Sequence, residues 1–168
     1  MVYGTSDPSS RSSGVTPMGL DQYFTAHSSL LLYDPRETAR RTQIKQLFDE
    51  LVDDDHCEIE RVICDIGSLR KANQIHRWMV ETVQNHQDDC EQYRLTPSHL
   101  DQLSLVLDQV NQFGHLAADL LPGADGCFFG SQSVDEWYFQ QITQCQKIVE
   151  RAQRLSQKGW DIYYQASW

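Results

Sequence analysis

The chain has 168 residues, which is about the size of one domain and enough to bury a core without disulfide staples. Hydrophobic residues make up 40% and charged residues 23%, an ordinary composition for a globular protein. The formal net charge of -10 argues against general nucleic-acid binding, which needs clustered lysine and arginine. The same charge permits a basic protein partner, or mimicry of a nucleic acid.

The sequence carries no sign of membrane insertion or export. No run approaches the roughly 18 apolar residues of a membrane span, and the first residues lack a signal-peptide core. We therefore expect a cytoplasmic protein. Its cysteines are widely spaced without a CxxC pair, so we predict reduced thiols, mostly small core residues, and neither a metal site nor a cofactor. They are Cys57, Cys64, Cys90, Cys127 and Cys145.

The first half of the chain is predicted to contain two strands and two helices. Residues 1–17, rich in Ser, Pro, Gly and Thr, read as a disordered leader before a single globular domain over 18–168. A short strand follows Leu20. Asp34 then caps a helix over 34–51, with Ile44, Leu47, Phe48 and Leu51 on its core face. A second strand covers about 58–66, and a helix capped by Ser68 covers about 69–85.

The second half continues this pattern. An extended piece near Tyr93 leads to a helix that starts at Thr96-Pro97. A glycine-containing connection over 115–132 leads to a capping box at Ser133 and the longest helix, which ends near Gln157. The alternating segment "WDIYYQASW" predicts a terminal strand that pairs with the strand near Tyr23. The expected fold is α+β, with about four helices on a small antiparallel sheet that includes the N- and C-terminal strands.

The polar stretch "RKANQIHRWMV" is the strongest candidate for a ligand site. On one continuous helix, Arg70, Asn73 and Arg77 share a face, and Arg70 and Lys71 occupy the positive first turn. That arrangement favours an anion, with Arg70, Lys71 and Asn73 as contacts and His76 as an acid–base group or hydrogen-bond donor.

The favoured alternative is a structural network. His76 would then bridge the core to a strand, and Arg70 would pair with an acid such as Asp65 or Asp135. Ser131 lies before a capped helix that could receive an anion, although the acids in its first turn argue against one. Trp168, a large aromatic residue at the last position, suggests a docked terminus whose carboxylate is held by Arg70 or Lys71.

Three other motifs are weaker. "HQDDC" from His86 to Cys90 mixes hard and soft ligands that suit no single metal, so we predict solvated acids leading to a buried Cys90. "GADGCFFGS" lacks the spacing of known phosphate loops, so its two phenylalanines are expected to plug the core. A cysteine paired with His76 stays open as a nucleophile, since nothing in the sequence selects one.

Five blocks in order resemble a family of small uncharacterised bacteriophage and prophage proteins. They are "MGLDQYF", "RKANQIHRWMVETVQ", "DDCEQY", "LLPGADGCFFGS" and "YYQASW". The likeness covers Met18 to Trp168 except the helix from Asp34 to Leu51. An aromatic often stands where Ser68 and Leu69 stand here, Gln22 replaces a methionine and Ala166 a serine, which puts shared site chemistry in doubt.

The resemblance implies an accessory protein of a phage or mobile element in the bacterial cytoplasm. Small phage proteins of this kind often modulate host systems. We therefore expect a non-enzymatic protein that binds and inhibits a host defence or regulatory factor through its acidic surface. The alternative is a protein or enzyme that binds a nucleotide or other small anion through Arg70, Lys71, Asn73 and His76. A third reading is an accessory that forms a homo-oligomer.

Overall fold

The structure is a computed structural model that describes residues 19–30, 35–48, 59–126 and 129–168. The predicted leader over 1–17 lies outside the described residues. So does the predicted helix cap at Asp34, together with Cys57 and Cys127.

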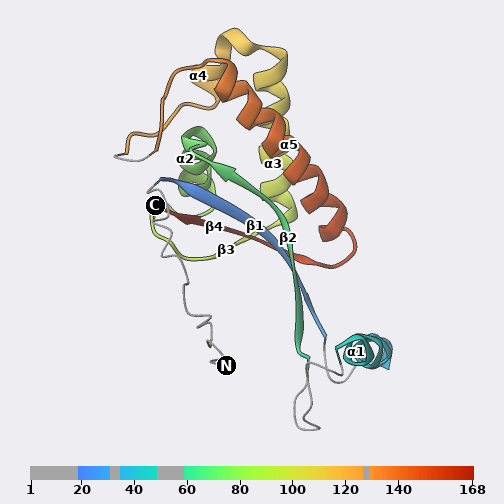
Figure 1. The fold of residues 1–168 in the computed structure, drawn as a ribbon. Helices are drawn as coiled ribbons and strands as arrows, with labels where there is room; N and C mark the ends of the chain where they lie inside the picture. The colour runs from blue at the N-terminus through green and yellow to red at the C-terminus, as the bar shows by residue number, and fades with distance from the viewer. Residues whose placement is uncertain (1–18, 31–34, 49–58, 127–128) are drawn as a thin grey trace, which may run out of the picture.

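Four strands form one antiparallel sheet, and the strand nearest the N-terminus lies in its interior (Figure 1). The order is β2-β1-β4-β3, so β1 pairs with both β2 and β4. Tyr23 of β1 lies opposite Gln165 of β4, which confirms the predicted pairing of the terminal strands. The strands are β1 (Asp21–Ser29), β2 (Arg61–Arg70), β3 (Tyr93–Leu95) and β4 (Asp161–Ser167).

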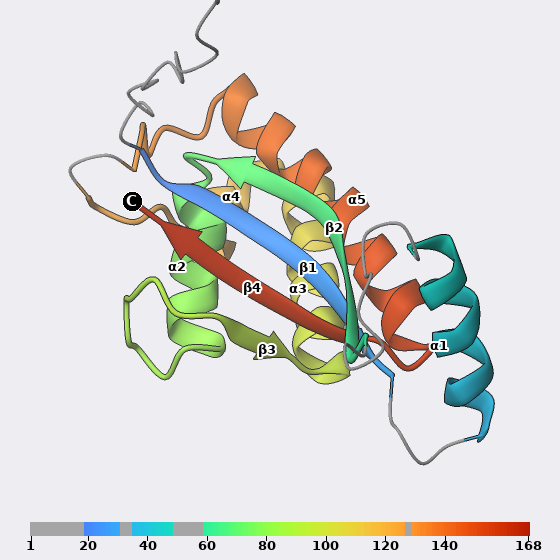
Figure 2. The same cartoon turned by 60° about the horizontal axis from the view of Figure 1, so that its bottom comes forward.

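Helices α2, α3 and α5 cover one face of this sheet, and α1 stands beside the far end of the β1–β2 pair (Figures 1 and 2). The α+β class is confirmed. The described residues contain five α-helices, one more than predicted, because α4 and a 3-10 turn at Gly114–Leu116 form inside the predicted connection. The helices are α1 (Pro35–Leu47), α2 (Asn73–Thr82), α3 (Pro97–Gln112), α4 (Ala117–Leu120) and α5 (Glu136–Ser156).

The hydrophobic core lies between the sheet and these three helices. The inward side chains of β1 and β4 meet there, and the rings of Phe24 and Tyr164 pack edge-on with centroids 5.3 Å apart. Burial of such aromatic surface removes a large apolar area from water and stabilises the core. The fully buried helix residues that face them include Ile75, Met79, Leu103, Leu107 and Ile142.

The boundary between β2 and α2 differs from the prediction. Strand β2 continues through Gly67 and Ser68 to Arg70, where it still pairs with Asp21. Lys71 then turns the chain with a φ of 56°, and α2 begins only at Asn73, without a side-chain cap. Pairing with β1 therefore overrides the helical spacing around Leu69, so the predicted helix start and the Ser68 cap are wrong.

Two other helix starts can be compared with their predicted caps. Thr96 caps α3 as predicted, because its side chain accepts from the backbone of His99 and Pro97 is the first helical residue. For α5 the predicted cap is wrong. Asp135, not Ser133, accepts from the backbone N–H of Tyr138 at 3.0 Å.

The predicted core face of the first helix is wrong for Leu47 and Phe48, whereas Ile44 is half-buried and Leu51 lies outside the described residues. The side chains of Leu47 and Phe48 are 81% and 45% exposed. Helix α1 is attached at the strand ends through Arg41, whose Nε donates to the Ile59 carbonyl at 3.1 Å, and it does not pack against the core. The spacing of apolar residues was helical, but α1 lies too far from the sheet centre to bury them.

The described cysteines differ in how deeply they are buried. Cys145 is buried, and burial raises the pKa of its thiol to about 12, so it behaves as a small apolar residue. Cys64 is half-buried. Cys90 is exposed, so its predicted burial is wrong. All three are free thiols.

None of the described helices is both long enough and apolar enough to span a bilayer.

Gly67 marks the closest approach of α5 to β2 and provides a test of this packing. Its φ is 144°, and an added Cβ would lie 2.6 Å from Cγ1 of Ile148. We expect Gly67→Ala to lower the free energy of unfolding by roughly 2–4 kcal/mol, since it adds both a clash and backbone strain. Urea denaturation measures this.

Gly159→Ala is the matched control. Gly159 has a φ of 85° but open space around its Cβ position, so only the backbone strain of about 1 kcal/mol should appear. Equal losses in both variants would contradict the packing of Ile148 on β2.

Candidate functional site

The predicted polar site is divided between a strand, a turn and a helix. Arg70 ends β2, and its Nε lies 3.7 Å from the carboxylate of Asp21 on the neighbouring strand, rather than beside Asp65 or Asp135. Lys71 is exposed in the turn. Neither belongs to the first turn of α2, so the predicted anion site at a helix start does not form there.

Asn73 contacts the long connection that follows α4. Its side-chain amide donates to the carbonyls of Phe129 and Ser131 at 3.0 and 2.9 Å, and its Oδ1 accepts from the N–H of Ala124 at 3.3 Å. The side chain is buried and uses both amide hydrogens. Asn73 therefore holds a loop in place. Ser131 itself is exposed, and its Oγ accepts from the N–H of Ser133.

Arg77 reinforces the same connection one turn later. Its Nη1 donates to the carbonyl of Gly123 at 3.1 Å, and its Nε pairs with Glu81 at 2.7 Å. An added Cβ at Gly123 would lie 2.9 Å from Oδ1 of Asn73, so the loop backbone lies directly against α2. The polar face of α2 is thus occupied by this chain's own loop.

His76 is the most buried titratable group of the predicted site, with 1% of its surface exposed. Its Nε2 lies 2.9 Å from the carboxylate of Asp88, and its Nδ1 lies 2.9 Å from the hydroxyl oxygen of Tyr164 on β4. The Tyr164 hydroxyl donates to Oε1 of Gln22, whose own amide donates to the Ala72 carbonyl. The structure therefore favours the structural alternative, a bridge from core to strand.

Burial lowers the pKa of His76 below its usual value, and the neighbouring Asp88 carboxylate offsets part of that shift. Burial also raises the pKa of Tyr164 well above its usual value, so its hydroxyl stays protonated. Both ring nitrogens of His76 have protein neighbours, which leaves none for a substrate. No described cysteine lies among these contacts.

Trp168 closes the same region. Its ring centroid lies 5.3 Å from that of His76 and 6.1 Å from that of Phe129, and these two rings also pack edge-on. The last side chain is thus docked over the histidine, with 40% of it still exposed. Phe129 is buried as predicted. That Arg70 or Lys71 holds the terminal carboxylate stays a prediction.

The aspartates of the "HQDDC" loop also form hydrogen bonds within the fold. Asp88 pairs with His76, and Asp89 accepts from the hydroxyl of Tyr93 and from the N–H of Glu91. Within the described part of the chain, no cluster of three or more His, Cys, Asp or Glu residues has the geometry to hold a metal ion.

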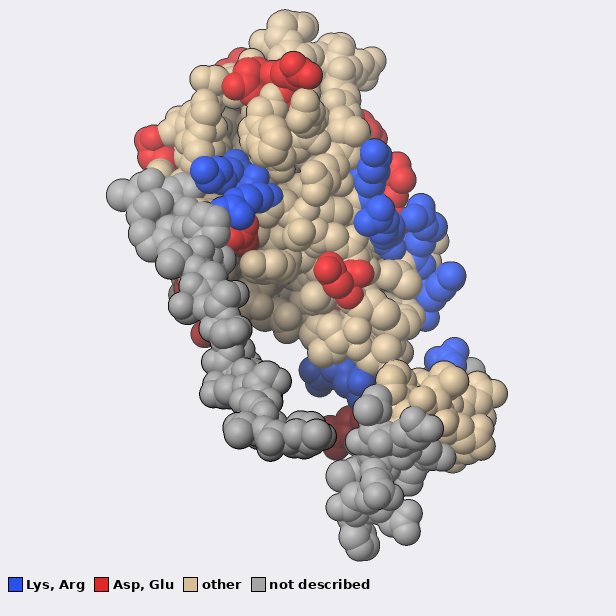
Figure 3. All heavy atoms as spheres, in the orientation of Figure 1, with Lys and Arg blue, Asp and Glu red and all other residues tan. Residues whose placement is uncertain are grey.

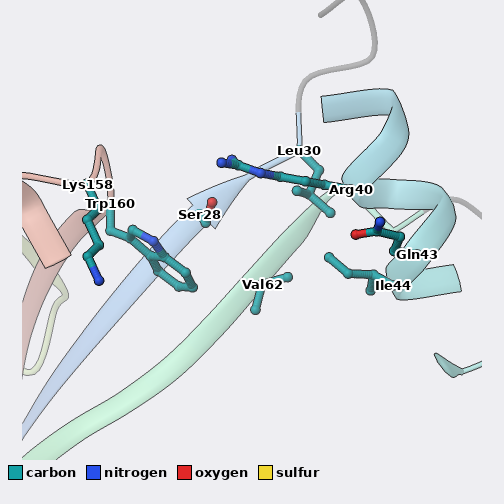
Figure 4. A pocket seen from close by; sticks show the side chains of 8 residues that line it. All are labelled: Ser28, Leu30, Arg40, Gln43, Ile44, Val62, Lys158 and Trp160. Carbon is teal, nitrogen blue, oxygen red and sulfur yellow. The ribbon is translucent and has the colours of Figure 1, made fainter. Parts of the chain in front are cut away.

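An open cleft of about 560 Å³ lies between α1, the ends of β1 and β2, and the turn that joins α5 to β4 (Figure 4). Its floor is formed by the strand ends, α1 forms one wall, and Trp160 with Lys158 forms the other. Sequence reasoning missed this cleft because its walls come from three distant segments. It is lined by Ser28, Leu30, Arg40, Gln43, Ile44, Val62, Lys158 and Trp160.

A row of cations follows one side of α5. Lys147, Arg151 and Arg154 are all exposed and recur at steps of four and three, which places them on one face of α5. Lys158, also exposed, follows in the turn after the helix. We call them the α5 basic stripe. Figure 3 shows Lys and Arg side chains gathered along this side of the molecule. The spacing is present in the sequence, but a net charge of -10 gives no indication of a basic face.

The α5 basic stripe borders a second hollow of about 510 Å³ between α5 and β2. Arg151 anchors this boundary, because its Nη1 donates to the carbonyl of Ile66 at 2.9 Å. Among the described contacts, the side chains of Lys147, Arg154 and Lys158 have no hydrogen-bond or ion-pair partner.

Comparison of the chain with known protein families, curated proteins and solved structures finds no match in any of the three.

The burial of His76 predicts a pH dependence of stability. Burial lowers the pKa of His76 and of His27 in the folded state, so below about pH 6.5 the unfolded chain takes up these protons first. Stability should be full above pH 6.5 and fall as the pH drops toward the folded pKa values, by up to about 1.4 kcal/mol per pH unit for each histidine. Denaturation at several pH values measures the slope.

His76→Gln keeps a polar side chain but removes one titrating group, so its stability should fall less steeply between about pH 7 and pH 5 than that of the wild type. A His76→Gln slope equal to that of the wild type would contradict a lowered pKa of His76 in the folded state.

Deletion of Trp168 tests the docked terminus. Loss of its contacts with His76 and Phe129 should lower the melting temperature by roughly 3–6 °C. Trp137→Ala, which removes an indole that is more than half exposed, should have a smaller effect. An unchanged melting temperature after the deletion would rule out a stabilising role for the terminus.

Proposed function

We propose that this chain is a non-enzymatic binding protein that engages an acidic segment of a protein partner through the α5 basic stripe. The observation that carries the proposal is the set of exposed cations on one helix face, three of which have no partner among the described contacts. Cations held close together repel one another, and an acidic segment laid along them would relieve that repulsion.

The carboxylates are less available than their number implies. Most of those described already accept hydrogen bonds or ion pairs within the fold. On α3, for example, Asp101 and Asp108 accept from Gln153 and Gln146 of α5. A partner that bound these acids would have to replace contacts already made. The acidic surface therefore remains the weaker choice, and its role in binding stays a prediction.

The length of the α5 basic stripe favours a short peptide segment as the ligand. From Lys147 to Arg154 the helix rises roughly 10 Å, which an extended segment of about three residues spans, and Lys158 follows in the next turn. A long polyanion such as DNA would extend beyond the stripe over a chain of net charge -10 and be repelled there. A short acidic segment of a protein needs to match the charge of the α5 basic stripe alone.

A binding role, rather than catalysis, is supported by the state of the predicted acid–base group. The ring of Trp168 packs against the buried His76, and both ring nitrogens of His76 have hydrogen-bond partners within the protein. The resemblance to small phage proteins adds the context: a host defence or regulatory protein in the bacterial cytoplasm as the partner, and its modulation or inhibition as the outcome.

The test is a fluorescence-anisotropy titration with a labelled glutamate-rich peptide of roughly ten residues. The wild type should bind it, and Lys147→Glu/Arg154→Glu should weaken binding at least about fivefold, since each reversal replaces an attraction by a repulsion. Glu150→Lys, which adds a cation to the same helix, should strengthen it. Raising the salt concentration should weaken binding in all three proteins.

Lys71→Glu/Arg94→Glu is the charge-matched control, because it changes the net charge equally at positions outside α5. If this control weakens binding as much as the α5 variant, the effect is one of net charge and the proposal fails. Tighter binding of a labelled oligothymidine than of the peptide would replace the protein partner with a nucleic acid.

A further inference from the structure

Strand β2 is the outermost described strand on the side of the sheet opposite β3, and α5 runs beside it (Figures 1 and 2). The outer edge of such a strand presents backbone N–H and C=O groups with which a further strand can pair. Its last part is already covered, because Arg151 and Gln144 of α5 donate to the carbonyls of Ile66 and Ser68. The open part of this edge therefore lies before Ile66.

The register with β1 shows which residues of β2 face this edge. The N–H of Leu30 donates to the Glu60 carbonyl, so these two residues form a hydrogen-bonded pair where the two strands begin to pair. Hydrogen-bonded and non-hydrogen-bonded pairs alternate along antiparallel strands. The backbone groups of Arg61, Ile63 and Asp65 therefore point away from β1, toward the side on which the structure describes no further strand.

The two faces of the sheet differ in charge and polarity beside this edge. Side chains alternate between the faces along a strand. Cys64 lines the hollow of about 510 Å³ on the helix side, together with Arg154 of α5 and Lys158 of the turn after it. Ile63 lies on the opposite face and is 57% exposed. A strand added beside β2 would thus meet cations on its helix side and an apolar side chain on the other.

The described lining of this hollow carries more positive than negative charge. Its carboxylate belongs to Asp65, whose Oδ1 accepts from the N–H of Gly67 at 2.8 Å. Its three cations are Arg151, Arg154 and Lys158. Among the described contacts, the side chains of Arg154 and Lys158 have no hydrogen-bond or ion-pair partner. A carboxylate that enters the hollow from an added strand would be attracted by both.

We propose that the acidic segment of the partner pairs with residues 61–65 of β2 as an added antiparallel strand. This inference rests on the proposed function and supplies its binding mode, in which backbone hydrogen bonds join the edge of β2 and carboxylates face Arg154 and Lys158. Because side chains alternate, the segment should carry acids at every second position, with apolar residues between them beside Ile63. A continuous run of acids would place half of its carboxylates on the face away from α5.

The experiment is a fluorescence-anisotropy titration of the full chain with the labelled peptide Glu-Val-Glu-Val-Glu-Val-Glu. Two further versions are N-methylated at all valines or at all glutamates. In the proposed pairing the valine N–H groups face β2, since the residues of a hydrogen-bonded pair lie directly opposite and share a face with Ile63. Methylation of the valines should weaken binding at least about tenfold, and methylation of the glutamates by less than about twofold.

The outcomes separate this binding mode from the proposed function. Equal binding of the unmodified and valine-methylated peptides would overturn strand addition and leave the α5 basic stripe as the binding surface. A larger loss from methylated glutamates than from methylated valines would overturn the antiparallel pairing. If the glutamate-rich peptide binds but the unmodified alternating peptide does not, strand addition fails alone, and if neither binds, the proposed function fails with it.

Amide hydrogen exchange of the full chain, followed by NMR, locates the added strand. The amides of Ile63 and Asp65 should exchange at least about tenfold more slowly with the unmodified peptide bound, because they gain hydrogen bonds. The amides of Val62 and Cys64 face β1 and are the internal control, since they should be protected in both states. Unchanged exchange at Ile63 in the complex would overturn the proposal.

Discussion

The hydrogen-bonded chain from Ala72 through Gln22 and Tyr164 to His76 is the interaction on which the rest of the structure depends. It places an amide, a phenol and an imidazole inside the core, where each would cost roughly 1–3 kcal/mol if it lacked a partner. Satisfying all of them at once requires β1, β4 and α2 in one relative position. The polar groups therefore specify the packing more narrowly than apolar contacts alone would.

The same constraint accounts for the long connection between α4 and α5. Asn73 and Arg77 extend this polar network outward and hold the loop by its carbonyls. Phe129 then packs on His76, and Trp168 packs on both. The polar residues of α2 resemble a ligand site in the sequence, but in the structure they hold other parts of the fold in place. We therefore place the binding surface elsewhere.

Charge is distributed unequally over the described surface. Many carboxylates are engaged by helix caps, backbone N–H groups and glutamine side chains, whereas the α5 basic stripe retains three cations without a partner. A chain of net charge -10 can thus present a locally basic face. Binding by this protein is expected where cations remain available, although acids are more numerous.

Features that depend on neighbours in the chain could be predicted from the amino-acid sequence. Thr96 and Pro97 start α3, apolar spacing defines α3 and α5, and alternation at the C-terminus defines β4. These signals are local because a cap or a period of 3.6 or 2 is decided within a few residues. The α+β class and the pairing of the terminal strands followed from them.

The remaining features depend on contacts between segments that are far apart in the chain. The helical spacing near Leu69 gave way to pairing with β1, since this distant strand supplies hydrogen bonds that no local pattern reveals. The polar residues of α2 became a scaffold because their partners, among them Tyr164 and Ser131, lie far along the chain. The cleft at Trp160 exists only where α1, the strand ends and the turn after α5 meet, so no single stretch of sequence contains it.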